Sequence, residues 1–298
     1  MSPFTRREFL KTSIAAGVAA GASSTLGSLP LVAEKRTATD LVPLGNSGLK
    51  VTRLAFGTGT FNGAIQAGLG QKEFSRQVHY AYDHGIRFFE TAESYMTPAM
   101  LAEALKPYPR DSYHLMSKVT TDDDPNPFRR LEEIRNTSQT EYFDIMLLHW
   151  QHTGSWVSDT ARWKDAIDEA QSKQLIRTRG ASVHGLPALR QVPGDRWLQI
   201  AMIRMNHNGT EMDGPNWSSS RNPASVNEVV DHVHQVRKEG MGVISMKLAG
   251  AGAFTGRADR QAAMRFAFQN AGVDCVTVGF KNTQEIDEAI DNINLAVA

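Results

Sequence analysis

From residue 42 onward, short apolar or β-branched runs alternate with longer stretches in which apolar positions recur every three to four residues. Gly, Pro, Asn and Asp separate these runs. The short runs predict β-strands and the longer stretches predict amphipathic helices. The chain is therefore expected to repeat a strand–helix unit. The eight predicted strands are residues 52–56, 86–90, 114–118, 143–149, 176–182, 198–205, 243–247 and 275–279.

Helical patterns fill most of the segments between these strands. Ser225 and Thr283 stand where N-caps are expected, and Gly85, Gly240 and Gly272 stand where glycine commonly ends a helix. These boundaries strengthen the prediction of a regular strand–helix alternation. The predicted helices are residues 71–84, 97–105, 127–136, 161–173, 226–238, 260–270 and 283–293.

This alternation points to one fold class. Eight strands alternating with helices over about 250 residues fit a (β/α)8 TIM barrel better than an open, doubly wound sheet. No G-x-G-x-x-G turn follows the first strand, which also argues against a doubly wound sheet. The turn residues 46–48 predict a short β-hairpin before the barrel. We expect residues 42–298 to form this barrel.

The first 33 residues differ in composition from the rest of the chain. Arg6 and Arg7 are followed by Phe9, Leu10 and Lys11 and then by a weakly apolar stretch rich in Ala, Gly and Ser. This stretch is too polar to predict a stable membrane span. The segment resembles a twin-arginine export signal. The resemblance implies a signal peptide in residues 1–33, a linker in residues 34–41, and export by the twin-arginine translocase to the periplasm, with membrane tethering if the signal stays uncleaved.

Composition excludes several classes of protein. The chain is 41% hydrophobic and 21% charged, which excludes a disordered chain. Lys plus Arg (32) equals Asp plus Glu (32), with both signs mixed along the chain, so a nucleic-acid partner is not expected. The single cysteine, Cys275, excludes an internal disulfide framework and a cysteine-rich metal site.

Four reactive side chains stand at or just after the carboxyl ends of the second, third and fourth predicted strands: Glu90, Tyr95, Lys118 and His149. TIM-barrel active sites lie at this end of the strands. Taken singly, Glu90 and Lys118 fit an ordinary ion pair, Tyr95 fits an aromatic residue of a loop, and His149 fits a buried histidine whose hydrogen bonds are made within the protein. Together they form a proton donor, because an ammonium lowers the pKa of a nearby phenol, a carboxylate holds that ammonium, and an imidazole orients a carbonyl.

The segment Glu90-Thr91-Ala92-Glu93-Ser94-Tyr95, followed by Ser117-Lys118 and Leu147-Leu148-His149, resembles the aldo/keto reductase superfamily, whose tetrad is Asp, Tyr, Lys and His in this order. The resemblance covers roughly residues 42–294. It implies that Tyr95 is the general acid/base, that Lys118 tunes it, that Glu90 replaces the family aspartate, and that His149 positions the carbonyl. The implied reaction is NAD(P)H-dependent reduction of an aldehyde or ketone to an alcohol, or its reverse.

The resemblance also implies a nicotinamide cofactor, with NADP(H) favoured and NAD(H) open. Glu285 stands where NADP-preferring members often carry a basic residue for the 2′-phosphate, and Ala289 replaces an asparagine that would touch adenine. Polar anchoring of the nicotinamide is reduced as well, because Met202 and Met246 occupy positions that are Gln and an aromatic in many members. The expected cofactor-binding residues are Gly57, Thr58, Gly59, Ser182, Met246, Lys247, Gly279 and Lys281.

Two other functions fit the sequence. His149, His152, His184 and His207, together with Glu90, are the residue types that bind Zn²⁺ or Mn²⁺, so a metal-dependent barrel enzyme is one alternative. The altered nicotinamide contacts leave open a weakly active barrel that binds or senses nucleotide. The substrate stays open among small aldehydes, ketones and oxidised sugars.

Overall fold

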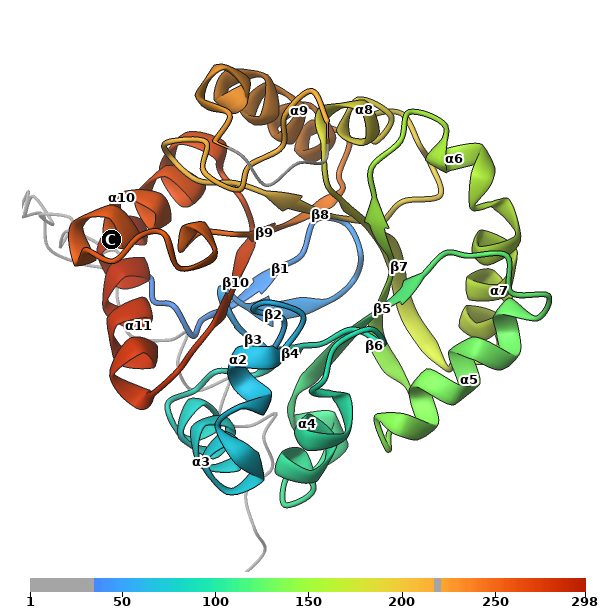
Figure 1. Cartoon of the computed structure of the whole chain (residues 1–298), viewed down its shortest axis with the longest axis horizontal. Coiled ribbons are helices and arrows are strands. Elements are labelled where there is room, and N and C mark those ends of the chain that lie inside the picture. Colours follow the sequence, from blue (N-terminus) through green and yellow to red (C-terminus); the bar gives the residue numbers. More distant parts are fainter. Residues whose placement is uncertain (1–34, 217–220) are drawn as a thin grey trace, which may run out of the picture. The chain divides into compact units, whose positions relative to one another are not determined.

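The computed structural model describes residues 35–216 and 221–298. In this part of the chain, eight parallel strands close into a barrel in the order β10-β3-β4-β5-β6-β7-β8-β9, and helices surround it (Figure 1). The predicted TIM barrel with a short preceding hairpin is confirmed. The expected export signal, residues 1–33, lies outside the described residues. No helix of the described ranges is both long and apolar enough to cross a membrane.

All eight predicted strands belong to the barrel, with ends that move by a few residues. The first starts two residues later than predicted, because Lys50–Thr52 pairs with Leu41–Pro43 in the hairpin instead. The hairpin strands are β1 (Leu41–Pro43) and β2 (Lys50–Thr52). The barrel strands are β3 (Leu54–Gly57), β4 (Phe88–Glu90), β5 (His114–Thr120), β6 (Phe143–Gln151), β7 (Ile176–Val183), β8 (Ile200–Arg204), β9 (Gly242–Met246) and β10 (Cys275–Gly279).

The seven predicted helices are all present. Three four-residue helices, α2, α6 and α8, were not predicted, because one turn is too short to show a helical period. The last predicted N-cap was one residue off: Asn282, not Thr283, caps α11 and accepts from the Glu285 N–H at 3.0 Å. The helices are α2 (Ala64–Ala67), α3 (Gly70–Asp83), α4 (Pro98–Leu105), α5 (Pro127–Thr137), α6 (Trp156–Asp159), α7 (Ala161–Ser172), α8 (Leu186–Leu189), α9 (Val226–Lys238), α10 (Arg257–Arg265) and α11 (Thr283–Val297).

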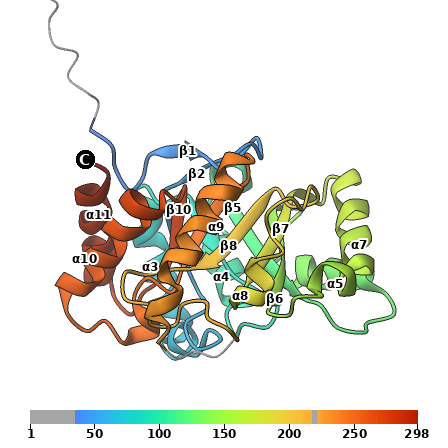
Figure 2. The same ribbon diagram turned by 90° about the horizontal axis from the view of Figure 1, so that it is seen from above.

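The hairpin β1–β2 packs on the amino-terminal end of the barrel (Figure 2). Leu44 and Val51 are fully buried in the apolar cluster inside the barrel, and the Asn46 N–H donates to the carbonyl of Gly240 at 2.7 Å. Gly45 has a φ of +51°, and a Cβ there would overlap the backbone before β9. The hairpin therefore fills the end of the barrel opposite the strand ends that carry the reactive side chains.

The barrel core has two layers, as alternating side chains of buried strands require. An inner cluster includes Phe88, Met116 and Ile244, and the larger outer cluster packs the strands against the helices. Burial of these apolar side chains provides most of the stabilisation. Above the inner layer, the strands end in polar side chains that face a cavity.

Candidate active site

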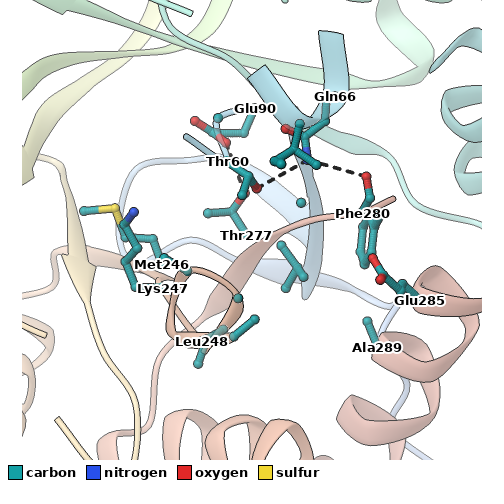
Figure 3. Close-up of a pocket in the computed structure, with 18 of the residues that line it drawn as sticks. Thr60, Gln66, Glu90, Met246, Lys247, Leu248, Thr277, Phe280, Glu285 and Ala289 are labelled. Carbon is teal, nitrogen blue, oxygen red and sulfur yellow. Dashed lines mark hydrogen bonds between the residues drawn. The ribbon is translucent and has the colours of Figure 1, made fainter. Parts of the chain in front are cut away.

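A cavity of about 870 Å³ lies at the carboxyl ends of the barrel strands, and part of its lining is drawn in Figure 3. Its volume is within the range of small-molecule and cofactor sites. Nine of the twelve predicted site residues line it: Gly57, Gly59, Glu90, Tyr95, His149, Met246, Lys247, Gly279 and Lys281. The other three, Thr58, Lys118 and Ser182, are buried and do not line this cavity.

Glu90 and Lys118 form a buried ion pair between β4 and β5. The Lys118 ammonium donates to Oε1 of Glu90 and, at 2.7 Å, to the carbonyl of Thr91. Thr277 on β10 donates to the second carboxylate oxygen of Glu90 at 3.3 Å. Burial lowers the pKa of Lys118, and the charge of Glu90 opposes this effect. The longer side chain of glutamate thus retains the ion pair expected from the sequence.

Tyr95 lies in the turn after β4, half-buried in the cavity wall. Lys118 Nζ is 4.7 Å from the centroid of its ring. A Cβ on Gly59 would overlap this ring and lie 2.5 Å from its hydroxyl oxygen. Glycine at position 59 is therefore required by the position of the phenol ring, and its contact with Tyr95 was not foreseen from the sequence.

The pKa of Tyr95 is held well above its ordinary value, first by burial and then by the negative charge of Glu90. The sequence predicts that Lys118 makes this phenol more acidic, whereas the net effect of the surroundings in the free protein is to raise its pKa. Burial is the first cause, and the carboxylate of Glu90, which together with the Thr91 carbonyl binds the Lys118 ammonium, adds negative charge beside the phenol. Tyr95 thus carries its proton at neutral pH.

His149, on β6, faces the phenol of Tyr95. The two ring centroids are 5.7 Å apart and the planes are nearly perpendicular. Burial, and then the charge of Lys118, lowers the pKa of His149 well below its ordinary value, so the imidazole is neutral at pH 7. Nδ1 lies 3.4 Å from the Ser94 hydroxyl. If that hydroxyl donates, the proton resides on Nε2, where it is available to a substrate oxygen.

His184 is a second imidazole in the cavity wall. Its ring centroid is 6.3 Å from that of His149, and its Nε2 lies 3.1 Å from the hydroxyl of Ser182. Burial, and then the charge of Arg204, lowers the pKa of His184 well below its ordinary value. Ser182 thus contacts His184 and does not itself line the cavity.

Thr58 also has a role other than the expected one. Its hydroxyl donates to the carbonyl of Glu90 at 3.0 Å and accepts from the hydroxyl of Thr97 at 2.8 Å. These bonds join the end of β3 to the end of β4 and to the start of α4. Thr58 thus fixes the backbone that carries Glu90, and it does not contact the cavity.

The cavity lining fits a bound dinucleotide. Gln66 and Asn292 line it, are each 1% exposed, and have side-chain oxygens without a hydrogen-bond partner. A Cβ on Gly57 would lie 2.7 Å from Oγ1 of Thr277, and one on Gly279 would lie 2.8 Å from Nε2 of Gln66. Buried side-chain oxygens without a hydrogen-bond partner, together with glycine backbone that no side chain covers, suit a ligand with several polar groups.

Sequence reasoning missed Gln66 and Asn292. Gln66 belongs to the short helix α2, which has no periodic pattern, and donates to Thr60 and to the Phe280 carbonyl (Figure 3). Asn292 is an asparagine on the buried face of α11. A polar residue among the apolar positions of that helix was the signal that could have identified it.

Strained backbone gathers around the same cavity. Eight non-glycine residues of the described ranges have positive φ, and four of them line the cavity: Asn62, Trp150, Lys247 and Ala251. Such conformations cost about 1–3 kcal/mol each and concentrate at functional sites. Three exposed apolar side chains, Phe61, Met96 and Trp150, stand on these loops or beside them. The mouth thus has an apolar rim.

The candidate metal ligands do not form a cluster. Within residues 35–216 and 221–298, no three side chains of the His, Cys, Asp and Glu types lie close enough to hold a metal ion. The His152 ring lies against Trp150, tilted by 36° at a centroid distance of 4.7 Å, and His207 lies 3.9 Å from Asp259 and beside Phe254. The geometry therefore gives no support to a site built from the four histidines.

Curated relatives match parts of the chain. Methylglyoxal reductase DkgA of Yersinia pestis is 28% identical over 134 residues, which are 44% of this chain and 46% of the relative. L-galactose dehydrogenase of Arabidopsis thaliana is 28% identical over 162 residues, 51% of this chain and 50% of the relative. The chain spans about half the length of the curated relatives it matches.

Solved structures share the fold over most of the chain. An aldo-keto reductase of Pseudomonas aeruginosa superposes with a TM-score of 0.69 at 19% identity, covering 88% of this chain and 98% of that one. The holo form of an aldo-keto reductase from Bacillus halodurans gives a TM-score of 0.67 at 16% identity, with 86% and 91% covered. The Aldo/keto reductase family model matches residues 53–264, more than two thirds of the sequence. The chain therefore belongs to the aldo/keto reductase family.

Proposed function

We propose that this protein reduces an aldehyde or ketone to an alcohol, with Tyr95 as the proton donor. The observation that carries the proposal is the meeting of Tyr95, His149 and the Glu90–Lys118 pair at one wall of the large cavity. A nicotinamide dinucleotide bound in the cavity would supply the hydride. Glycines 57 and 279, Gln66, Lys247 and Asn292 are the residues that we expect to hold it.

The residues divide the work at the reaction centre. His149, neutral at pH 7, donates a hydrogen bond to the substrate oxygen and fixes its position. Tyr95 retains its proton in the free protein and transfers it to that oxygen as negative charge develops there. The Lys118 ammonium, held by Glu90, lies beside the phenol ring and compensates the negative charge that Tyr95 gains when it gives up its proton. The apolar rim at Phe61, Met96 and Trp150 supports a substrate with an apolar part.

The test is turnover compared with nucleotide affinity. Purified protein with NADH or NADPH and methylglyoxal, the substrate in the name of one relative, is followed at the absorbance of the reduced nicotinamide. Carbonyl-dependent oxidation supports the proposal. Tight nucleotide binding without turnover on a panel of aldehydes and ketones would favour the nucleotide-binding barrel instead. Export by the twin-arginine route, with Arg6 and Arg7 as its signal, is a separate proposal that depends on sequence resemblance alone.

A further inference from the structure

The cavity has two chemically different ends. Tyr95 and His149 mark one end, where the carbonyl must meet the hydride. The other end reaches helix α11, whose Glu285 and Ala289 lie away from Glu90 in Figure 3. If the proposed function holds, a dinucleotide with its nicotinamide at Tyr95 places its adenosine at α11. The side chains there decide which adenosine fits.

The Glu285 carboxylate lies beside the backbone N–H groups that a ribose 2′-phosphate at this end would use as hydrogen-bond donors. Its Oε2 accepts from the Lys281 N–H at 2.8 Å, and the Asn282 side chain takes the N–H of Glu285 itself at 3.0 Å. These amides belong to the amino-terminal end of a 15-residue helix, which favours negative charge. The chain thus satisfies this end of α11 with a carboxylate of its own.

Arg260 is a cation that lines this end of the cavity, and four of its five N–H donors are already used. Nε and Nη2 donate to the two carboxylate oxygens of Glu288 at 2.6 and 2.9 Å, and Nη1 donates to the carbonyls of Phe254 and Thr255 at 2.9 and 2.8 Å. Glu288 also lines the cavity. A phosphate would have to displace that carboxylate to bind the guanidinium.

Arg260 and Lys281 are the cations that line this end of the cavity, and Glu285 and Glu288 are the acids, so the formal charges of these four side chains sum to zero. Among the described residues, Glu285 forms no salt bridge, although its charge reaches Arg260, whereas Arg260 and Glu288 form a salt bridge with each other. Lys281 is exposed, so water and salt screen its ammonium. A carboxylate repels a phosphate dianion but accepts hydrogen bonds from ribose hydroxyls. We infer that Glu285 makes this site select a dinucleotide with a free ribose 2′-hydroxyl, NAD(H), and reject the 2′-phosphate of NADP(H).

Three proteins test this inference by calorimetric titration with NADH and NADPH: wild type, Glu285→Gln and Asp287→Asn. Glu285→Gln removes the charge and keeps an acceptor for the Lys281 N–H. Asp287→Asn removes the same charge from the same helix, but Asp287 does not line the cavity and instead accepts from the Tyr80 hydroxyl at 2.9 Å. Thermal melts confirm that each variant is folded.

We expect wild type to bind NADH at least about tenfold more tightly than NADPH, which corresponds to about 1.4 kcal/mol. Glu285→Gln should lose most of this ratio by gaining affinity for NADPH, and Asp287→Asn should retain it. Tighter binding of NADPH to wild type, or an unchanged ratio in Glu285→Gln, would overturn the inference and leave the proposed function intact. Failure of wild type to bind either nucleotide would overturn the proposed function and this inference with it.

Discussion

Lys118→Met removes one partner of the buried ion pair beside Tyr95. Lys118 is 1% exposed and Glu90 is 3% exposed, so the variant leaves a desolvated carboxylate without a cationic partner, with Thr277 and the Tyr95 phenol as its neutral neighbours. Breaking a buried pair in this way costs about 3–5 kcal/mol. For a domain of this size, each kcal/mol lowers Tm by about 2–4 °C, so a decrease of roughly 6–20 °C is expected.

The matched control is Lys106→Met, which breaks the pair with Glu103 on α4, where both side chains are about half exposed. Exposed pairs contribute less than about 1 kcal/mol, so this variant should melt within a few degrees of wild type. The double variant Glu90→Gln/Lys118→Met should recover much of the lost stability, because no charge is left buried. Differential scanning calorimetry measures all four proteins. If Lys118→Met has the same Tm as Lys106→Met, the Glu90–Lys118 pair is not desolvated and the account of the site is wrong.

Three further predictions concern the same elements. Glu90→Gln removes the charge that, together with burial, raises the pKa of Tyr95, so the alkaline decline in kcat/KM for reduction should move to lower pH. In wild type, kcat/KM should stay constant from about pH 6 to 9, because the phenol is protonated there. An unchanged pH profile in Glu90→Gln would contradict this cause. Gly59→Ala places a methyl group in the Tyr95 ring and should lower kcat at least about a hundredfold with the fold retained, and full activity would refute the contact. Asn282→Ala removes the N-cap of α11 and should cost about 1 kcal/mol in urea denaturation, whereas an unchanged midpoint would exclude the cap.

Much of the fold could be predicted from the sequence, because long periodic segments encode it locally. The helix Val226–Lys238 was predicted to the residue, and Gly85 and Gly240 follow helices with φ near +90° as expected. Short elements could not be predicted in this way. Residues 50–52 directly precede the first barrel strand in the sequence, and only their pairing with residues 41–43 assigns them to the hairpin.

The site could be predicted at the level of residue types, and less well at the level of contacts. Their position at or near the carboxyl end of a strand placed Glu90, Tyr95 and His149 at one cavity, because parallel strands end at the same edge of a barrel. The direction of the Tyr95 pKa depends on how deeply the phenol is buried and on its distance from the Glu90 carboxylate, and a sequence gives neither. Whether Thr58 and Ser182 face the cavity or the wall behind it likewise depends on side-chain packing across strands.

The central claim is that the Tyr95 hydroxyl supplies the proton for carbonyl reduction. Tyr95→Phe removes that hydroxyl and keeps the ring, and Tyr108→Phe is the control, since Tyr108 does not line the large cavity. The decisive measurement is kcat for reduction alongside the Kd of the reduced nucleotide in both variants. We expect Tyr95→Phe to lose at least about a thousandfold in kcat with Kd within about twofold of wild type, and Tyr108→Phe to retain both. Wild-type kcat in Tyr95→Phe would contradict the account.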